Sequence, residues 1–241
     1  MTEVLVASDR APGLHVGSGV EIPTDTHIAP YVTVYPGVEI GKGVTLGQGA
    51  ILGRPQEVDA RSRADRRAAG DTTRIGAGTR VGSSAVVVAS AWIGERVYIG
   101  EGVLVRETAV LGDDAMIGTR SIVGVDTTVG PRSRFHAMCL VGPGTVIEED
   151  VHVSANVTFV SDPTMGRRGR VGAGPRTLVR RASRFGVGVI VLPPCEIGEE
   201  AVVGAASLVR GDVPPRTVVA GTPARPLRPV RDDELLGEWI D

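Results

Sequence analysis

His136 is the side chain whose type and position in this sequence best suit proton transfer. It follows the apolar residue Phe135, at a position that the surrounding sequence usually gives to glycine. Imidazole is the side chain whose ordinary pKa lies closest to neutral pH, so it can accept and release a proton there. A histidine there could take the proton that an attacking nucleophile loses. His136 is therefore the candidate catalytic residue; the alternative is a histidine at a surface corner with no chemical role.

An arginine-rich segment follows, from Pro163 to Arg184, with seven arginines and no acidic residue. Guanidinium groups bind phosphates through two parallel hydrogen bonds, and the rest of the chain is acidic, because the net charge is −2. The segment predicts a phosphate-binding loop, with Arg167 and Arg168 as candidate substrate-binding residues. The alternative is a solvated loop without a ligand.

The other histidines and the two cysteines form no convincing metal site. His136 and His152 are 16 residues apart and occupy different positions of the repeat described below, so we expect them to point in different directions. Cys139 and Cys195 fall at small, inward positions of that repeat, where we expect buried spacers. No metal is therefore expected.

These residues are positioned by a six-residue repeat. Every sixth residue is apolar over residues 16–52, again over 75–159, and again over 185–209, and a small residue usually follows four positions later. A period of six fits neither a helix, with 3.6 residues per turn, nor an ordinary alternating strand. It fits a repeated unit of one short strand and one turn, in which each apolar residue packs on its equivalents in adjacent coils.

The repeat predicts the domain organisation. A single solenoid of about nine coils occupies residues 1–225. Its phase breaks twice, which predicts loops over 54–74 and 160–184. Residues 226–241 form a tail, in which Asp232 or Asp233 starts a short helix that caps the open end of the solenoid.

Composition narrows the function classes. A net charge of −2 does not favour a nucleic-acid or membrane partner, and no apolar run approaches the roughly 20 residues of a membrane span. The opening residues MTEVLVASDRAPG are too short and too acidic for a signal peptide, and there are only two cysteines. We therefore expect a cytoplasmic protein.

The repeat [LIV]-G-x-x-[small]-x resembles that of the hexapeptide-repeat acyltransferases over about residues 16–225. The segment RFHAMCLVGPGTVIEEDVHVSANVTFVSD is similar to the active-site region of nucleotide-sugar N-acetyltransferases, and DVPPRTVVAGTPA to the ending of acetyl-CoA-using members. The resemblance implies an all-β fold, a left-handed parallel β-helix, which usually forms homotrimers with active sites between subunits. In some relatives, glutamine and asparagine stand at the positions of His136 and Ala137, so His136 is either a base or only a hydrogen-bond donor.

The resemblance also implies binding residues for the acceptor. Ser161-Asp162 lies where relatives often carry an Asn-Asp pair, and Asp162 would contact the amine or a hydroxyl of the acceptor. Asn156, in the last hexads before the second loop, is the other candidate acceptor-binding residue. The alternative for Asp162 is a turn residue before Pro163.

The donor site is implied in the same way. In the family, small residues with free amides line the groove for the pantetheine arm, at positions that match Gly186, Gly188, Ala205 and Ala206. Two arginines of the last coils, Arg210 and Arg225, could reach the 3′-phosphate of the coenzyme. The alternatives are that the small residues serve coil geometry and the arginines serve solubility.

The function implied by the resemblance is transfer of an acetyl group from acetyl-CoA to the amino group of a nucleotide-linked amino sugar. Three alternatives stay open: another acceptor, such as a hydroxyl or a small amine; a scaffold without activity; and a γ-type carbonic anhydrase. Acetyl-CoA binding, an acceptor screen and metal analysis separate them.

Overall fold

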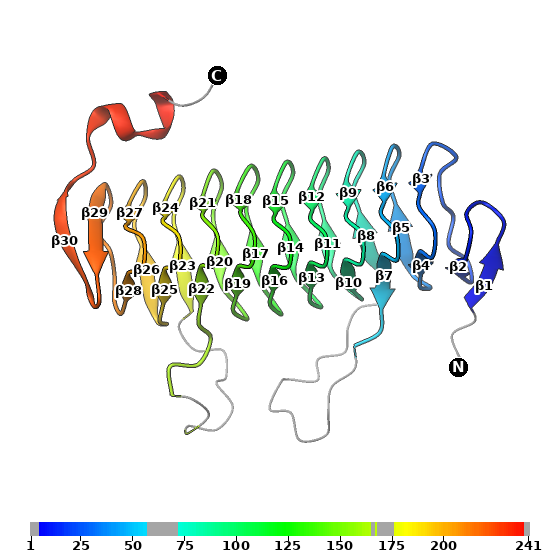
Figure 1. Ribbon diagram of the computed structural model, residues 1–241, viewed down its shortest axis with the longest axis horizontal. Helices are drawn as coiled ribbons and strands as arrows, with labels where there is room; N and C mark the ends of the chain where they lie inside the picture. Colours follow the sequence, from blue (N-terminus) through cyan, green and yellow to red (C-terminus); the bar gives the residue numbers. More distant parts are fainter. Residues whose placement is uncertain (1–4, 57–71, 165–166, 168–175, 239–241) are drawn as a thin grey trace.

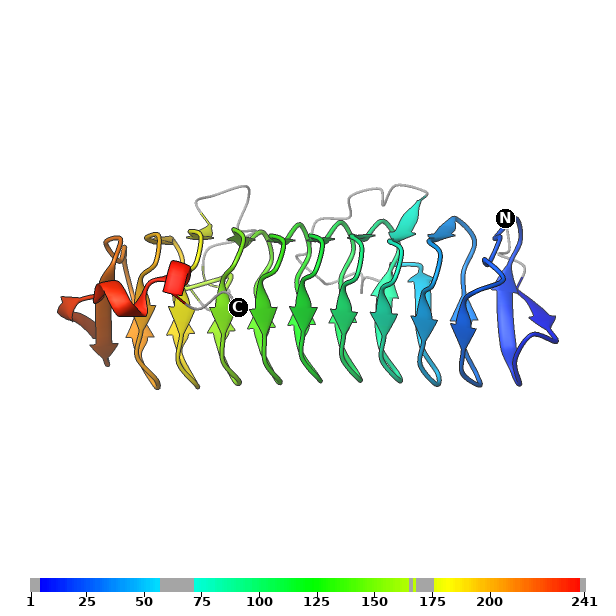
Figure 2. The same cartoon turned by 90° about the horizontal axis from the view of Figure 1, so that it is seen from above.

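The computed structural model of the chain describes residues 5–56, 72–164, 167 and 176–238. In this part, short strands wind into a long prism with three sheets as its sides (Figure 1). Figure 2 shows the coils as an evenly spaced row along the long axis. No helix in the described part is long and apolar enough to cross a membrane. The predicted all-β solenoid is confirmed.

Sheet A has eleven strands, and all its pairs are parallel except the first. Its strands are β1 (Leu5–Ser8), β2 (Leu14–Gly17), β4 (Thr33–Val34), β7 (Ile51–Arg54), β10 (Val86–Val88), β13 (Leu104–Val105), β16 (Ile122–Val123), β19 (Leu140–Val141), β22 (Thr158–Phe159), β25 (Ile190–Val191) and β28 (Leu208–Val209).

Sheet B also has eleven strands, and its last pair is antiparallel. Its strands are β3 (His27–Ile28), β6 (Thr45–Leu46), β9 (Arg80–Val81), β12 (Tyr98–Ile99), β15 (Met116–Ile117), β18 (Arg134–Phe135), β21 (His152–Val153), β24 (Arg184–Phe185), β27 (Val202–Val203), β29 (Thr217–Gly221) and β30 (Ala224–Pro229).

Sheet C has eight strands. They are β5 (Val38–Ile40), β8 (Thr73–Ile75), β11 (Trp92–Ile93), β14 (Val110–Leu111), β17 (Thr128–Val129), β20 (Val146–Ile147), β23 (Thr177–Val179) and β26 (Cys195–Ile197).

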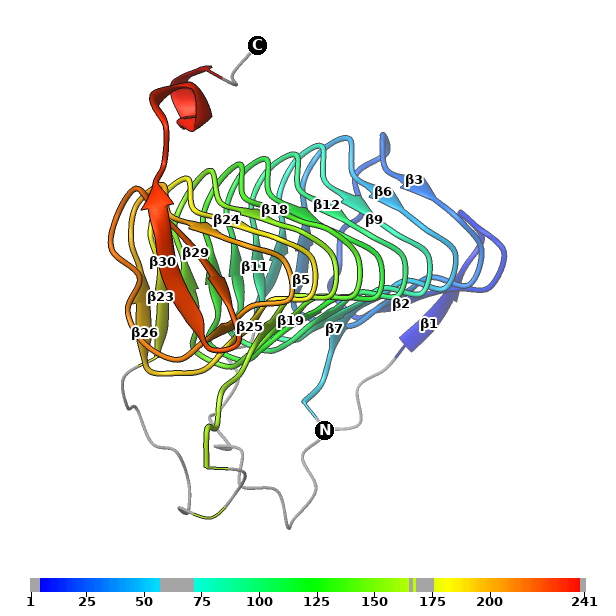
Figure 3. The ribbon, with the colours of Figure 1, turned by 60° about the vertical axis from the view of Figure 1, so that its left-hand side comes forward.

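Each coil visits the sheets in the order B, A, C. Figure 3 looks along the prism from its C-terminal end, and the chain runs clockwise through these sheets while it advances toward the viewer, so the helix is left-handed. The coils number about ten, not the nine expected, because β29 forms a further parallel rung after Pro215, beyond the last repeat counted in the sequence. The fold class, a left-handed parallel β-helix, is the one predicted.

Three corners join the sheets, and we name them by the strands they connect. The BA corner follows each strand of sheet B, as at His136–Met138; the AC corner follows sheet A, and the CB corner follows sheet C. The glycine after an apolar stop is required by close approach: a Cβ on Gly118 would lie 2.5 Å from the backbone carbon of His136 in the next coil. The left-handed backbone falls two residues later, as at Met138, with φ 59°.

The interior is filled as the repeat predicts. Stop residues from Val34 to Val209 are buried, except Ile40, which is partly buried, and the small residues four positions later are buried too. Several of these small residues donate a hydrogen bond to a corner carbonyl of the next coil, such as Ser133 Oγ to Glu148 O at 2.7 Å. Cys139 and Cys195 are buried free thiols, as expected of spacers.

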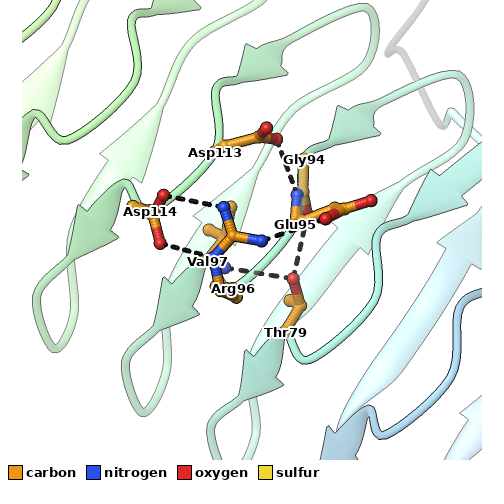
Figure 4. A network of polar contacts seen from close by, with 7 residues as sticks. All are labelled: Thr79, Gly94, Glu95, Arg96, Val97, Asp113 and Asp114. Carbon is orange, nitrogen blue, oxygen red and sulfur yellow. Dashed lines mark hydrogen bonds and ion pairs between the residues drawn. The ribbon is translucent and has the colours of Figure 1, made fainter.

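Stacked ion pairs tie successive turns of the CB corner together. In Figure 4, the Arg96 guanidinium donates two hydrogen bonds to the Asp114 carboxylate of the next coil, from Nε to Oδ1 at 2.8 Å and from Nη2 to Oδ2 at 2.9 Å. The amide of Glu95 donates to Asp113 Oδ1. Arg132 makes the same ion pair with Asp150 two coils later, with Nε to Oδ1 at 2.7 Å. The Arg96 guanidinium holds the pKa of Asp114 below its ordinary value. Because both arginine side chains are 54% exposed, we assign these ion pairs to the register of the coils rather than to net stability.

One of the two expected loop boundaries needs correction. The second loop is shorter than 160–184, because β23 and β24 already belong to sheets C and B; the repeat resumes at Val179, one hexad earlier than expected. The first loop begins and ends within two residues of its expected bounds, since β7 ends at Arg54 and β8 begins at Thr73. Both interruptions lie at the AC corner.

The tail also differs from expectation. Residues 224–229 form β30, which pairs antiparallel with β29 and so becomes the last strand of sheet B. The helical part is two 3₁₀ turns, Asp232–Glu234 and Leu236–Glu238, with Asp232 at the start of the first. Figures 1 and 2 place these turns alongside the last coils rather than over the open end. The predicted cap is therefore wrong, and β30 occupies that end.

Candidate active site

The BA corner brings together six of the residues singled out by sequence. Four successive coils place His136, Asn156, Gly186 with Gly188, and Ala205 with Ala206 at equivalent turns. Backbone hydrogen bonds stack these turns: the amide of Asn156 donates to Ala137 O at 3.0 Å, and that of Gly188 to Ala155 O at 3.0 Å. Residues far apart in sequence thus form one continuous edge of the prism.

An open groove runs along the same corner and ends at Ala137 and Met138, the two residues after His136. Its volume is about 440 Å³, and it is lined from Ser83 and Glu101 through Thr119 and Arg120 to Met138. Thr119 Oγ1 donates to Glu101 Oε2 at 2.8 Å, and this bond contributes to keeping the pKa of that carboxyl below its ordinary value. The groove has room for an extended chain to approach His136.

His136 lies against a second histidine. It follows β18 directly and is exposed, whereas His152 points outward from β21 and is half-buried. The ring centroids are 5.0 Å apart, with the planes at 59°. The expectation that these two histidines point in different directions is therefore wrong: a corner position and the outward strand position of the next coil meet at the same edge.

The environment of His152 disfavours its charged form. Burial lowers its pKa below the ordinary value of 6.5, and the positive charges of His136, Arg184 and Arg134 lower it further. His152 is consequently a neutral imidazole at neutral pH, in van der Waals range of His136.

This depressed pKa predicts a pH-dependent stability. As pH falls below about 6.5, the unfolded chain binds the proton first, so the folded state loses stability until the lowered folded pKa is passed. Replacing His152 by glutamine should flatten the dependence of the urea midpoint on pH below 6.5 while leaving the midpoint at pH 8 nearly unchanged. His27→Gln, on β3 of the same sheet, is the matched control and should keep the wild-type profile; a wild-type profile in His152→Gln would contradict the prediction.

The backbone amides of the corner are less free than the resemblance implies. Those of Gly186, Gly188 and Ala206 all donate to neighbouring coils, to Val203 O at 2.8 Å, Ala155 O at 3.0 Å and Val187 O at 2.8 Å. The amides of Val187 and Ala205 have no acceptor in the described part of the chain. Of the expected residues, Ala205 alone offers an unpaired amide, and Val187 joins it.

Gly186 itself serves the coil, because a Cβ there would lie 2.5 Å from the amide nitrogen of Ala205. Gly188, in contrast, has φ +72° with nothing within 4 Å of an added Cβ. Asn156 occupies the equivalent left-handed position of the preceding coil, with φ 60°, and is exposed. The open side of the corner thus carries Asn156 and Gly188.

Asp162 and Arg167 do not lie at the BA corner. Asp162 follows β22 at the AC corner, so the width of sheet A separates it from His136 within one chain. Its Oδ1 accepts hydrogen bonds from the amide of Thr164 at 2.7 Å and from Thr164 Oγ1 at 2.6 Å, which is the turn role that the sequence left open. Arg167 is exposed on the same excursion, and Arg168 lies outside the described residues.

Comparison with known proteins bears on what this corner does. Residues 19–54 match the family described as bacterial transferase hexapeptide (six repeats), and residues 68–163 match the GMPPB C-terminal domain. Serine acetyltransferase of Escherichia coli K12 is 37% identical over 86 residues, which cover 36% of this chain and 29% of that protein. The resemblance to hexapeptide-repeat acyltransferases is confirmed.

Two further matches are shorter or weaker. A Schizosaccharomyces pombe protein that carries an acetyltransferase name is 48% identical over 49 residues, 20% of this chain and 24% of that protein. Among solved structures, PerB of Caulobacter crescentus, in complex with CoA and GDP-perosamine, has 26% identity and a TM-score of 0.38 over 62% of this chain and 57% of that one. The chain spans only about a quarter of the length of the curated relatives it matches first.

Two arginines of the arginine-rich segment, Arg180 and Arg181, are neutralised by acids. Arg180 bonds to Glu148 Oε1 at 2.9 Å and to Glu196 Oε1 at 2.7 Å, and Arg181 Nη2 donates to Glu199 Oε1 at 2.6 Å. The predicted single loop of free positive charge is therefore wrong for these two residues, which lie in the solenoid and pair with acids of adjacent coils.

The two arginines that were expected to bind the coenzyme phosphate lie at different corners of the prism. Arg210 is exposed at the AC corner after β28. Arg225 lies on β30 opposite Ala220, next to the BA corner, where Thr222 Oγ1 donates to Ala206 O at 3.3 Å. Arg225 therefore belongs to the edge that carries His136, and Arg210 does not.

Sequence reasoning missed the outward row of sheet B. Arg134, His152 and Arg184 lie on consecutive strands, in register, and flank His136. The available signal is that each immediately precedes an apolar stop, which makes it an outward position. In the described part of the chain, no group of three or more His, Cys, Asp or Glu side chains could hold a metal ion.

Proposed function

We propose that the protein is an acetyl-CoA-dependent acyltransferase with His136 at its reaction centre. The observation that carries the proposal is the BA corner, where His136 lies against a neutral His152 and directly precedes Ala137 and Met138, the last residues that line the open groove. The acetyltransferase names of its sequence relatives support the same activity. The acceptor we propose is the amino group of a sugar attached to a nucleotide.

The reaction needs one nucleophile and one proton transfer. The lone pair of the neutral amine attacks the carbonyl carbon of the thioester, the C–S bond breaks, and the sulfur leaves with the electron pair. The amine nitrogen loses a proton, which His136 accepts and can pass to the departing sulfur. Where His136 only donates or accepts a hydrogen bond, that proton goes to the sulfur directly.

Chain groups of the corner fit the donor side. The unpaired amides of Val187 and Ala205 can donate to an amide carbonyl of the pantetheine arm or to the developing oxyanion. Gly188 leaves open space beside them, and Arg225 supplies a positive charge at the same edge for a phosphate. Acetyl-CoA itself supplies the activated acyl group.

A second acceptor class has a specific observation in its favour. Several relatives are serine acetyltransferases, which suggests a small amino acid hydroxyl as the alternative acceptor. A screen of nucleotide amino sugars, serine and simple amines with acetyl-CoA separates the two acceptor classes. The proposed compartment is the cytoplasm, where two buried free thiols stay reduced.

Binding of acetyl-CoA is the first test of the proposal. A ligand that binds only the folded state stabilises it by about 2.7 kcal/mol at a hundredfold excess over its dissociation constant. We expect a saturable rise of the melting temperature with acetyl-CoA and with desulfo-CoA, but no rise with zinc chloride. No rise at millimolar coenzyme would favour the scaffold alternative, and a rise with zinc alone the carbonic anhydrase.

We further propose a homotrimer that packs through sheet A. The outward residues of this sheet form an aliphatic row, in which Ile122, Leu140 and Ile190 are 39%, 41% and 42% exposed. A neighbour against this sheet would bury the row and let the AC corner of one copy, with Asp162, approach the BA corner of another.

The trimer predicts a sheet-specific effect of charge. Ile122→Lys should dissociate the assembly, because it places an ammonium in an apolar interface. Val146→Lys is the matched control, since Val146 is 38% exposed on sheet C. Light scattering after size exclusion should give one third of the wild-type mass for the first variant and the full mass for the second. A trimeric Ile122→Lys protein would contradict packing through sheet A.

A further inference from the structure

Three cationic or titratable side chains stand in line on the outer face of sheet B. Arg134, His152 and Arg184 are Cα partners on β18, β21 and β24. Neighbouring strands lie about 4.8 Å apart, so the two arginines are about 10 Å apart at Cα with His152 between them. Side chains one strand apart in register can act on one ligand together.

Neither arginine of this row is neutralised within the described part of the chain. Other arginines of nearby coils are: Arg132 pairs with Asp150 at 2.7 Å, and Arg180 with Glu148 at 2.9 Å. Arg134 and Arg184 make no ion pair or side-chain hydrogen bond to any described residue. The positive charges of both arginines instead contribute to lowering the pKa of His152.

The acids nearest along the chain do not change this balance. Glu149 and Asp150 belong to the CB corner before β21, and the carboxylate of Asp150 is held by Arg132. The groups that face His152 are Arg134, Arg184 and His136, and all can carry positive charge. A row of unpaired positive charge beside a candidate reaction centre is electrostatically complementary to an anion.

We propose that Arg134, His152 and Arg184 bind a phosphoryl group of the acceptor, with a diphosphate as the best fit, beside the amine that His136 serves. This rests on the proposed acyl transfer and deepens it, because it assigns the acceptor's anionic part to sheet B. Two guanidinium groups at this spacing can each take one phosphoryl group of a diphosphate through paired hydrogen bonds. A neutral His152 between them can donate a further hydrogen bond.

The proposal is tested by binding, without turnover. Protein with ¹³C-labelled histidine is titrated with pH by NMR, with and without saturating sodium pyrophosphate at constant ionic strength. A bound anion within about 4–5 Å favours the charged imidazole, so the pKa of His152 should rise by about 0.5 or more. The double variant Arg134→Gln/Arg184→Gln should show no such rise and should bind pyrophosphate at least tenfold more weakly.

Arg80 supplies the matched control. It occupies the same outward row on β9, three strands from Arg134 in the order of sheet B. Arg80→Gln should keep the wild-type rise and affinity. A His152 pKa that pyrophosphate leaves unchanged, or that rises equally in the double variant, overturns the proposal. An equal rise with malonate also overturns it, because the row would then select carboxylates.

Two further measurements distinguish a phosphate of the coenzyme from one of the acceptor, and the anion site from the proposed acyl transfer. Pyrophosphate should still raise the pKa of His152 when desulfo-CoA saturates the protein. If desulfo-CoA alone raises this pKa and pyrophosphate adds no further rise, the row binds the coenzyme, and the acceptor assignment is overturned. If pyrophosphate binds as expected but no acetyl transfer occurs with any acceptor, the anion site stands and the proposed function fails.

Discussion

Replacing His136 by alanine is expected to lower kcat for acetyl transfer by about 10²–10⁴-fold, the range that general acid–base catalysis usually contributes. The reason is local: His136 is exposed at the end of the groove, while its neighbour His152 is half-buried on the strand of the next coil. The measurement is steady-state kinetics with acetyl-CoA and the acceptor that the screen identifies. Because His136 is exposed, the melting temperature of the variant should stay within about 2 °C of wild type.

The same residue allows its two candidate roles to be separated. His136→Gln keeps a hydrogen-bonding group but removes the titrating nitrogen, so a loss as large as that of alanine indicates a base, and a small loss indicates a hydrogen-bond donor. The acid limb of the pH profile of kcat/KM should vanish in His136→Gln only when His136 is the base. His27→Ala, on β3 of the same sheet, should leave the kinetics unchanged. Full activity in His136→Ala would exclude both roles.

The regular part of this fold could be predicted from sequence because its core repeats. An apolar residue at every sixth position specifies where each strand turns inward, and a small residue four positions later leaves room at the next corner. The six candidates that the structure brings together were predicted in three roles, catalytic, acceptor-binding and coenzyme-binding; they share one corner because equivalent positions of successive coils must stack. Local rules therefore sufficed for the solenoid and for the BA corner.

What sequence could not predict depends on which coils become neighbours. Glu148 and Arg180 pair across 32 residues, and His152 meets Arg184 across the same interval, because the excursion after Phe159 lengthens one coil. If all residues from 160 to 184 are taken as a loop, Arg180 and Arg184 fall in a segment of unpaired positive charge. The correct register becomes visible only when Val179 is recognised as the stop that resumes the repeat.

The antiparallel ending was missed for a similar reason. Strand β30 carries prolines and arginines rather than an apolar stop, so no hexad signal marks it. It is defined by pairing with β29, with the turn at Thr222 and Pro223 between them. Likewise, His136 and His152 lie close together because a corner residue of one coil meets a strand residue of the next coil. Their spacing of 16 residues, rather than 18, does not reveal this contact.

Phe159→Ala is expected to destabilise the protein by about 3–5 kcal/mol, the usual cost of truncating a fully buried phenylalanine. Phe159 has no exposed surface, and its ring packs edge-on against Phe185 with centroids 5.3 Å apart. It is also the last stop before the chain leaves the solenoid at the AC corner. Urea unfolding followed by circular dichroism measures the loss, and an increase in midpoint or a loss under about 1 kcal/mol would contradict it.

The aromatic pair gives this prediction a sharper form. Phe135 is equally buried on sheet B but has no ring partner among the described phenylalanines, so Phe135→Ala measures the cavity cost alone. A double-mutant cycle of Phe159→Ala and Phe185→Ala should return a coupling of about 0.5–1.5 kcal/mol, as edge-to-face pairs do. Phe135→Ala combined with Phe159→Ala should be nearly additive by comparison. Because a solenoid's stability is close to a sum of coil and neighbour terms, a coupling confined to the 159–185 pair would show that this pair joins the coils on either side of the second excursion.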